Sequence, residues 1–330
     1  MKKIILSRTD NLGDVILTLP MAGFLKKHLP GCHIIFLGKS YTRPLIERSR
    51  FVDAFLDWDE LKKNEQKAID AFRSTGADTI VHVFPVSFIS RVAMKAGIKN
   101  RIATTGRIYS WFYSNKLVRL TRRRSELHEA QLNIRMLEPL GVPVDIGLNE
   151  IPDFYGFTPS HVTRHTSPFT VILHPKSKGS AREWGLENYA RLIHLLTPRQ
   201  YDILVTGTRE EGDLMRDFLK QHEDRIKDLT GKLKLSELID TIDSADALVA
   251  ASTGPLHIAA ALGKVAIGLY APMRPIFPKR WAPLGKNAVF LCKETECNDC
   301  RKSGDCHCIR EITPETVVEN LTSRLQNDLP

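Results

Sequence analysis

Long apolar runs are missing from this 330-residue sequence. No uninterrupted apolar stretch approaches the roughly 18 residues that a membrane-spanning helix needs. The apolar part of the N-terminus is only Ile4, Ile5 and Leu6, which is too short for the core of a secretory signal peptide. We therefore expect a cytoplasmic protein.

Cysteine is also scarce: there are six, and five of them lie between Cys292 and Cys308. This number excludes a disulfide scaffold, and in a cytoplasmic chain the clustering favours a metal site or redox-sensitive thiols. The spacing resembles a structural zinc site, although its closing Cys-x-Cys is shorter than usual; free thiols or a disulfide are the alternatives. The four candidate zinc ligands are Cys297, Cys300, Cys306 and Cys308.

Several catalytic signatures are absent. The sequence has no HExxH zinc motif, no Walker lysine motif and no GxGxxG dinucleotide fingerprint. No recognised nucleic-acid-binding module is present either, so we expect no nucleic-acid partner. The chemistry that remains needs no redox cofactor, and we expect none to be required for catalysis.

Positive charge is plentiful, but only in one half of the chain. Residues 1–150 contain 24 Lys and Arg against 15 Asp and Glu, whereas residues 151–330 contain 23 of each. This asymmetry indicates an anionic partner for the N-terminal half, with a solvated surface as the alternative. The candidate contacts to an anionic acceptor are Arg8, Arg122, Arg123 and Arg124.

Short apolar runs alternate with amphipathic segments in both halves, which predicts two α/β domains with parallel, doubly wound sheets. We place the first domain at residues 1–155, a proline-rich linker at 156–168 and the second domain at 169–330. The expected strands are 3–7, 33–37, 52–55, 79–84, 169–174, 201–206, 247–251 and 265–270, and the expected helices are 14–28, 61–74, 126–140, 186–196, 210–221, 255–262 and 314–325.

Asp14 follows the first expected strand at the start of a helix. A carboxylate there can cap the helix and interact with its dipole. Because the carboxyl ends of parallel strands carry the ligand-binding loops of such domains, Asp14 can instead act as a general base toward a hydroxyl group. The spacing alone leaves both interpretations open.

The second domain offers two candidate phosphate-binding segments. Thr253 and Gly254 lie where a strand runs into a helix, so they present free amide donors at its positive end, and His257 lies one turn later. A cationic loop supplies Lys176, Lys178 and Arg182. An ordinary capped helix and a solvated loop are the alternatives. Glu210 and Glu211 are weaker candidates for holding ribose hydroxyls, since glutamate is favourable in the first turn of any helix.

Three segments carry a resemblance to a known family. RTDNLGDVILTLP at 8–20, HPKSKGSAREW at 174–184 and STGPLHIAAALG at 252–263 resemble the glycosyltransferase family that contains the ADP-heptose:lipopolysaccharide heptosyltransferases. The resemblance implies a GT-B fold, in which two Rossmann-like domains face a central cleft. The donor would bind the C-terminal domain and the acceptor the N-terminal one.

The resemblance also implies an activity. It is the inverting, metal-independent transfer of a heptose or related sugar from an ADP-sugar to a lipopolysaccharide core acceptor, with Asp14 as the base. Arg182, Thr253, Gly254 and His257 match the family's donor-phosphate contacts. An anionic glycolipid acceptor would bring the protein to the inner membrane face as a peripheral partner. A nucleotide-sugar epimerase and a zinc-containing nucleic-acid-binding protein are the alternative functions.

Overall fold

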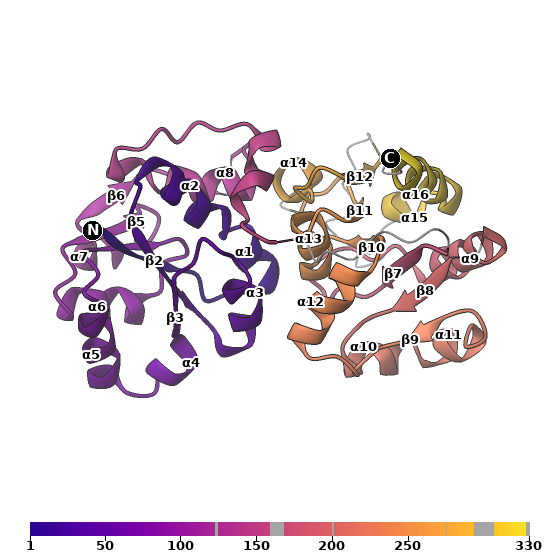
Figure 1. Cartoon of the computed structure of the whole chain (residues 1–330), viewed down its shortest axis with the longest axis horizontal. Helices are drawn as coiled ribbons and strands as arrows, with labels where there is room; N and C mark the ends of the chain where they lie inside the picture. Colours follow the sequence, from indigo (N-terminus) through magenta and orange to yellow (C-terminus); the bar gives the residue numbers. More distant parts are fainter. Residues whose placement is uncertain (123–124, 159–167, 200, 275, 294–306, 328–330) are drawn as a thin grey trace. The chain divides into compact units, whose positions relative to one another are not determined.

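The computed structural model describes residues 1–122, 125–158, 168–199, 201–274, 276–293 and 307–327. It divides the chain into two compact units, Met1–Thr158 and Pro159–Pro330. Each unit contains a six-stranded parallel sheet with helices on both faces (Figure 1). No helix among the described residues is both long and apolar enough to cross a bilayer.

Unit 1 has the strand order β3-β2-β1-β4-β5-β6. Its strands are β1 (Lys3–Ser7), β2 (His33–Gly38), β3 (Ala54–Asp57), β4 (Thr79–His82), β5 (Asn100–Thr104) and β6 (Lys116–Val118). Its helices are α1 (Leu12–Ile16), α2 (Pro20–His28), α3 (Arg43–Glu47), α4 (Trp58–Leu61), α5 (Glu65–Thr75), α6 (Ser87–Lys95), α7 (Ser110–Tyr113) and α8 (Glu129–Arg135), with 3-10 turns at Ser40–Thr42, Glu138–Leu140 and Leu148–Phe154.

Unit 2 repeats this plan with the order β12-β11-β10-β7-β8-β9. Its strands are β7 (Thr170–His174), β8 (Asp202–Val205), β9 (Lys227–Asp228), β10 (Ala247–Ala251), β11 (Val265–Tyr270) and β12 (Ala288–Cys292). Its helices are α9 (Leu186–Leu196), α10 (Arg209–Leu214), α11 (Arg216–Gln221), α12 (Leu235–Ser244), α13 (Gly254–Ala261), α14 (Pro278–Trp281), α15 (His307–Arg310) and α16 (Pro314–Asn327), with a 3-10 turn at Thr197–Arg199.

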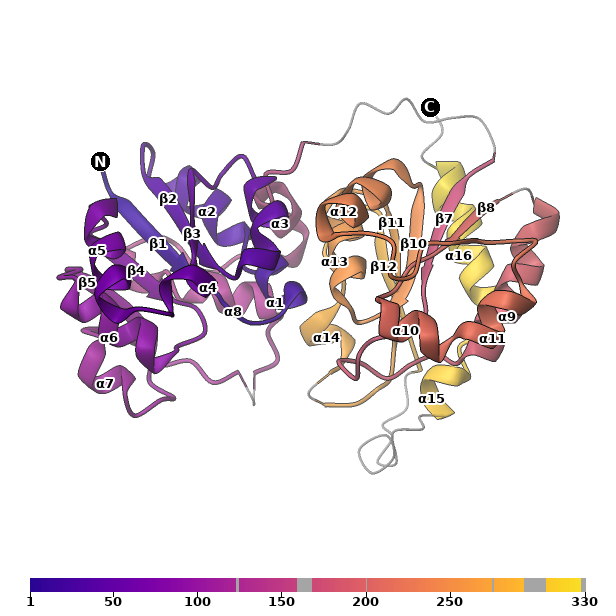
Figure 2. The same ribbon diagram turned by 90° about the horizontal axis from the view of Figure 1, so that it is seen from below.

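Central strands buried on both faces explain the continuous apolar runs of the sequence. Every residue of β10 and β11 is buried. In unit 2, one face of the sheet packs against α9 and α16, as Figure 2 shows, and the fully buried indole of Trp184 donates a hydrogen bond to the Ile312 carbonyl at 2.8 Å. In unit 1, α5 and α6 cover one face of the sheet with residues such as Phe72 and Ile89.

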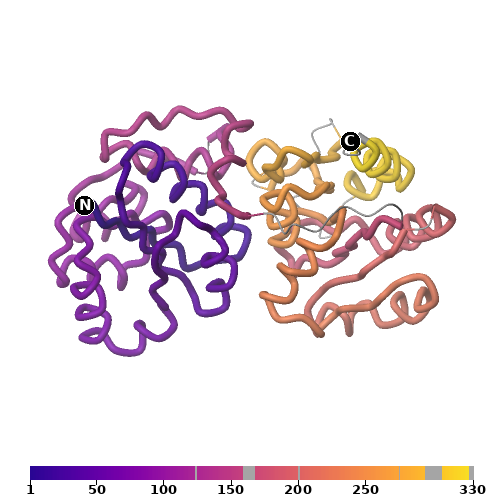
Figure 3. The backbone as a smooth tube through the Cα atoms, in the orientation of Figure 1, coloured from indigo at the N-terminus to yellow at the C-terminus, as the bar shows by residue number. Residues whose placement is uncertain are grey.

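Two of the expected helices are split; the one expected over 210–221 forms α10 and α11, which are separated at Met215. The pattern of apolar residues over 14–28 predicted a single helix, but α1 ends at Ile16 and α2 begins at Pro20, a path that Figure 3 follows. Proline has no amide hydrogen to donate, and its ring collides with the preceding turn, so it favours the first position of a new helix. The break leaves α1 as a short helix that carries Asp14 in its first turn.

Candidate active site

The loop after β1 carries a buried arginine. Arg8 directly follows the strand, its amide donates to the Leu37 carbonyl at 3.1 Å, and the side chain is only 2% exposed. Because β1 and β4 are parallel, Ser7 lies beside His82 and both strands end at the same edge of the sheet. The Arg8 guanidinium is therefore held at the edge where ligand-binding loops of such sheets gather.

Three carboxylates surround this guanidinium. Its Nε donates to Asp10 Oδ1 at 2.6 Å, its Nη2 donates to Asp14, and its Nη1 lies 3.5 Å from Glu129 Oε1. Burial lowers the pKa of Arg8, but the three negative charges outweigh this effect and leave it raised. Arg8 is therefore a permanent positive charge inside an acidic cluster.

Asp14 is the member of this cluster whose protonation is most strongly altered. Its side chain is 16% exposed, and burial raises the pKa to about 6 despite the opposing charge of Arg8; Asp10 and Glu129 raise it further. Among the described residues the Arg8 guanidinium is the hydrogen-bond partner of this carboxylate, and no backbone amide of α1 donates to it. The carboxylate is thus not occupied as a helix cap.

Glu129, in the first turn of α8, joins the cluster from a distant part of the chain. It is 1% exposed and also forms an ion pair with Arg122, whose Nη2 donates to the Val83 carbonyl at 2.9 Å. Three carboxylates against two guanidinium groups leave one negative charge uncompensated. That excess charge, with burial, explains why a proton is retained on Asp14 up to an unusually high pH.

A pH profile can test this electrostatic account. If Asp14 must be ionised for turnover, kcat/KM should rise with pH and level off above an inflection near 6. Glu129→Gln removes one of the charges that raise this pKa, so the inflection should move to lower pH, and near pH 5 the variant should retain about two- to fivefold more of its plateau rate. The matched control Glu138→Gln, an exposed residue outside the cluster, should leave the profile unchanged. An unmoved inflection in Glu129→Gln would contradict the account.

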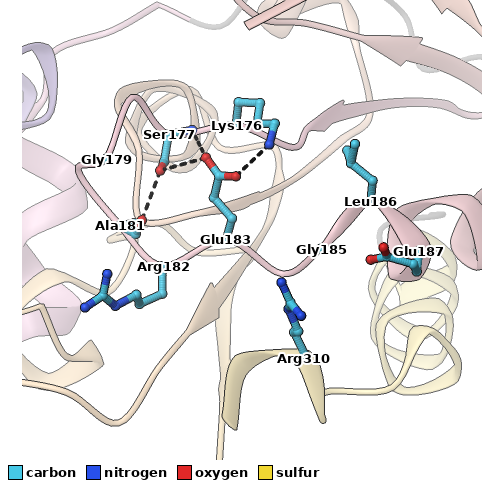
Figure 4. Close-up of a pocket in the computed structure, with 10 residues that line it drawn as sticks. All are labelled: Lys176, Ser177, Gly179, Ala181, Arg182, Glu183, Gly185, Leu186, Glu187 and Arg310. Atoms are coloured by element: carbon cyan, nitrogen blue, oxygen red, sulfur yellow. Dashed lines mark hydrogen bonds and ion pairs between the residues drawn. The ribbon is translucent and has the colours of Figure 1, made fainter. Parts of the chain in front are cut away.

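Unit 2 contains a polar pocket of about 370 Å³ at the loop that follows β7 (Figure 4). Lys176 and Arg182 line it, together with Arg310 from α15. The Lys176 ammonium donates to Glu183 Oε2 at 2.8 Å, and Ser177 binds the other carboxylate oxygen through its amide at 3.1 Å. In Figure 4 the Arg182 side chain points away from this carboxylate, whereas Lys176 is turned toward it. The remaining lining residues are Gly179, Ala181, Gly185, Leu186 and Glu187.

The start of α13 presents a second polar feature. Thr253 is the N-cap residue, but its side chain makes no capping bond, and its buried hydroxyl has no hydrogen-bond partner among the described residues. Gly254 and Pro255 open the helix, while His257 is 2% exposed one turn later. A buried hydroxyl without a partner costs free energy unless a bound molecule or water satisfies it. This helix end therefore has unmet hydrogen-bonding capacity.

The other predicted residues of unit 2 have local partners. Glu211 is 5% exposed and accepts the Thr208 amide at 2.8 Å in a capping box, so its carboxylate already stabilises the start of α10. Glu210 is exposed and lies 3.7 Å from the Lys178 ammonium. A ribose contact by either glutamate stays a prediction.

Comparison with known proteins decides the class. The model of glycosyltransferase family 9 (heptosyltransferase) matches residues 83–308, more than half of the chain. The chain belongs to glycosyltransferase family 9. It is therefore a glycosyltransferase of the heptosyltransferase family.

Relatives extend over the full length of this glycosyltransferase. Lipooligosaccharide heptosyltransferase 2 of Campylobacter jejuni is 21% identical over 335 residues, covering 98% of this chain and 99% of the relative. The structure of Escherichia coli ADP-heptose lipopolysaccharide heptosyltransferase II superposes with a TM-score of 0.77 at 18% identity and covers 100% of both chains. E. coli heptosyltransferase WaaC with ADP gives 0.72 at 17% identity, covering 98% and 99%. The GT-B fold expected from the sequence is confirmed.

Other residues of the two candidate sites were not predicted from the sequence. Asp10, Glu129, Glu183 and Arg310 were not singled out, because each has the local pattern of an ordinary loop or helix-start residue. Of the predicted cysteine cluster, Cys297, Cys300 and Cys306 lie outside the described residues, as do Arg123 and Arg124. Cys308 is described and is buried. The zinc site stays a prediction.

Proposed function

We propose that this family 9 enzyme transfers a heptose from an ADP-sugar to a lipopolysaccharide core acceptor with inversion at the anomeric carbon. The observation that carries the proposal is the Asp14 carboxylate, partly exposed in the first turn of α1, with a pKa raised to about 6. A carboxylate with such a pKa is largely ionised at neutral pH and is more basic than an ordinary aspartate. It suits the removal of a proton from an acceptor hydroxyl.

The proposed reaction is a single displacement. The acceptor oxygen gives its proton to Asp14 and attacks the anomeric carbon, while the bond from that carbon to the β-phosphate oxygen breaks and ADP leaves with the electron pair. Attack from the face opposite the leaving group inverts the configuration. Arg8 is 2% exposed and surrounded by carboxylates, so we assign it to positioning Asp14 instead of contacting the acceptor.

The donor half of the proposal rests on unit 2. Arg182, Arg310 and the open helix end at Thr253 and Gly254 supply charge and hydrogen bonds suited to a departing diphosphate. These groups would do the work that a divalent cation does in other transferases. ADP is the nucleotide in the structure of the relative WaaC, and this agrees with an ADP-sugar donor. Lys176 and Lys178 are secondary candidates because each already faces a glutamate.

One reaction tests the proposal. Purified lipopolysaccharide core lacking its outer heptose should gain the mass of one heptose when incubated with enzyme and ADP-heptose, and nuclear magnetic resonance should show the anomeric configuration opposite to that of the donor. The rate should persist in excess EDTA. Loss of the rate in EDTA would refute metal independence, a retained configuration would refute inversion, and no product with any core acceptor would refute the proposed substrate.

Donor binding gives a separate prediction. Arg182→Ala should weaken ADP binding by about 10- to 150-fold, since a charge-assisted hydrogen bond contributes about 1.5–3 kcal/mol. Isothermal titration calorimetry measures this directly. Arg191→Ala, which removes an exposed arginine of α9 paired with Glu315, is the matched control and should bind ADP like the parent. Equal ADP affinity in Arg182→Ala and the control would place the donor phosphates elsewhere.

A further inference from the structure

One stretch of unit 1 accounts for the positive charge of the whole chain. Residues 79–125 contain ten Lys and Arg and no Asp or Glu, while the net charge of the full sequence is +9. The stretch includes α6, β5, α7 and β6, and β6 is the edge strand of the sheet. Carboxylates from other segments pair with Arg91, Lys95 and Arg122, while Arg107 and Arg119 on this flank are exposed.

Large apolar side chains project from the middle of this basic stretch. Ile108 is 82% exposed, Trp111 61% and Phe112 73%, and the last two belong to the short helix α7, labelled beside α6 in Figure 2. Isolated exposed apolar residues are common on protein surfaces, but three of this size within five positions form a patch. Such a patch marks a surface that is covered when the protein works.

The backbone beneath the patch is firmly held. The Tyr109 hydroxyl donates to the Pro85 carbonyl at 2.5 Å, Ser110 is fully buried, and the Trp111 indole donates to the Thr105 carbonyl at 3.2 Å. Tyr109 and Ser110 thus face the unit while the residues on either side of them face outward. The exposed side chains are presented by a built turn, and their exposure is a stable feature of the surface.

The patch also adjoins the Asp14 cluster. The Phe84 ring lies between two guanidinium groups, 5.7 Å from that of Arg8 and 5.8 Å from that of Arg107, which immediately precedes Ile108. On the other side, the Thr105 amide donates to the Val118 carbonyl at 3.1 Å, and exposed Arg119 follows. Arginines thus flank the apolar side chains, and Phe84 connects them to the residue that holds Asp14.

We propose that Ile108, Trp111 and Phe112 insert into the interfacial layer of an anionic lipid bilayer, with Arg107 and Arg119 on its headgroups. Apolar and aromatic side chains beside arginines are the composition of interfacial anchors, and the exposed Arg107 and Arg119 complement anionic lipid. The role of this anchor, though not the binding itself, rests on the proposed function: an anchor beside Asp14 brings that base to a hydroxyl of a membrane-embedded glycolipid. Neither a neutral bilayer nor a basic protein surface offers this complementarity.

Tryptophan fluorescence provides the first test. Trp111 is well exposed, whereas Trp58 and Trp184 are buried and Trp281 is partly buried, so Trp111 should dominate any change in emission. Vesicles of phosphatidylcholine and phosphatidylglycerol in equal parts should shift the emission to the blue, and brominated lipid should quench it. Trp111→Phe should lose the signal but still sediment with the vesicles. Phosphatidylcholine vesicles should have little effect, and salt should weaken the binding.

A matched pair of variants tests the apolar contact. Phe112→Ser should weaken binding to the anionic vesicles, measured by sedimentation, by about tenfold or more. The parent transfers the phenyl ring from water into the bilayer interface, and the variant loses this favourable contribution. Leu214→Ser in unit 2 removes a side chain that is also 73% exposed and should bind like the parent. Equal binding by Phe112→Ser and Leu214→Ser would overturn the proposal. The proposal would also be overturned if the parent did not bind anionic vesicles but formed dimers, and if Phe112→Ser dissociated those dimers.

Activity separates this inference from the proposed function. With a deacylated, water-soluble core acceptor, Phe112→Ser should turn over at the parent's rate, whereas with acceptor embedded in anionic vesicles it should be slower by a factor near its loss of binding. If neither acceptor is glycosylated while anionic vesicles still bind the parent, the proposed substrate fails and the anchor stands. If both acceptors are used equally by parent and variant, the anchor fails and the transfer reaction stands.

Discussion

Asp14→Asn should lower kcat by about 10²–10⁴-fold, the usual contribution of a positioned general base, while leaving ADP affinity nearly unchanged. Asparagine keeps the shape of the side chain but cannot accept a proton at neutral pH. The backbone role of the position also survives, because the Asp14 carbonyl, which accepts the Thr18 hydroxyl at 2.8 Å, is not altered. Steady-state rates with saturating donor and acceptor measure the effect, and calorimetry on ADP measures the affinity.

Asp10→Asn is the informative comparison. Asp10 lies four residues before Asp14, binds the same guanidinium through Nε and is 23% exposed, so each substitution removes one carboxylate from the same cluster. A general base at Asp14 predicts a much smaller loss for Asp10→Asn. If Asp10→Asn proves the more damaging change, Asp10 is the base. If Asp14→Asn retains turnover within about threefold, neither the raised pKa nor the position of Asp14 serves proton transfer.

The pH dependence of the activity is a second test of the role of Asp14. Because the carboxylate must be ionised to accept a proton, the parent should lose activity as pH falls through about 6. The residual activity of Asp14→Asn should lack that inflection. An inflection that persists in the variant would assign it to another group.

The neighbourhood of Asp14 could be predicted only in part from sequence. The strand before Asp14 can be predicted from the local sequence, because residues 4–6 are apolar. The structure has β1 there, with the expected bounds Lys3–Ser7. Glu129 and Arg122 come from more than a hundred residues further along. In sequence, Glu129 is one acidic residue at the start of one helix, where glutamate is common for its effect on the helix dipole. Only the folded sheet brings it to Arg8.

The fold shows the same division between local and non-local information. The closing helix was expected over 314–325 behind a Thr313 cap; α16 spans Pro314–Asn327, and the Thr316 amide donates to the Thr313 hydroxyl at 3.3 Å. Four strands were missed. Strands β6 and β9 have three residues and two, too few for any pattern to appear. Strands β5 and β12 have five residues each and were missed as well. Pairing with β5 and β8 forms β6 and β9, and this depends on residues distant in sequence.

The two sites also differ in what their residues revealed. Gly254 and Pro255 predict the start of a helix whose backbone a phosphate could approach. The structure has this helix, α13, which begins at Gly254. The cationic loop suggested three equivalent positive charges. In the structure the Lys176 ammonium donates to Glu183, and the Lys178 ammonium lies 3.7 Å from Glu210. Sequence reveals which charges are present, but their pairing depends on side-chain geometry.

Arg8→Met should lower the free energy of unfolding by about 3–5 kcal/mol at neutral pH, the cost expected when one partner of a buried ion pair is removed. Methionine fills most of the space but leaves Asp10, Asp14 and Glu129 without their shared cation. Urea unfolding followed by circular dichroism measures the loss. Arg43→Met removes an arginine that is 48% exposed and 3.6 Å from Asp57, and this control should cost less than about 1 kcal/mol.

The loss in Arg8→Met should shrink as the pH falls. Without the guanidinium, burial and the neighbouring carboxylates raise the pKa of Asp14 in the folded state still further above its unfolded value, so protonation of Asp14 stabilises the folded variant. The gap between parent and variant should therefore be widest near neutral pH and narrow toward pH 5. In the same variant the activity inflection should move to higher pH, because Arg8 lowers the pKa of Asp14.

Arg8→Lys keeps the charge but not three simultaneous hydrogen bonds, so its stability and its inflection should lie between those of the parent and Arg8→Met. A pH-independent loss of stability with an unmoved inflection would mean that Arg8 only fills space beneath the site.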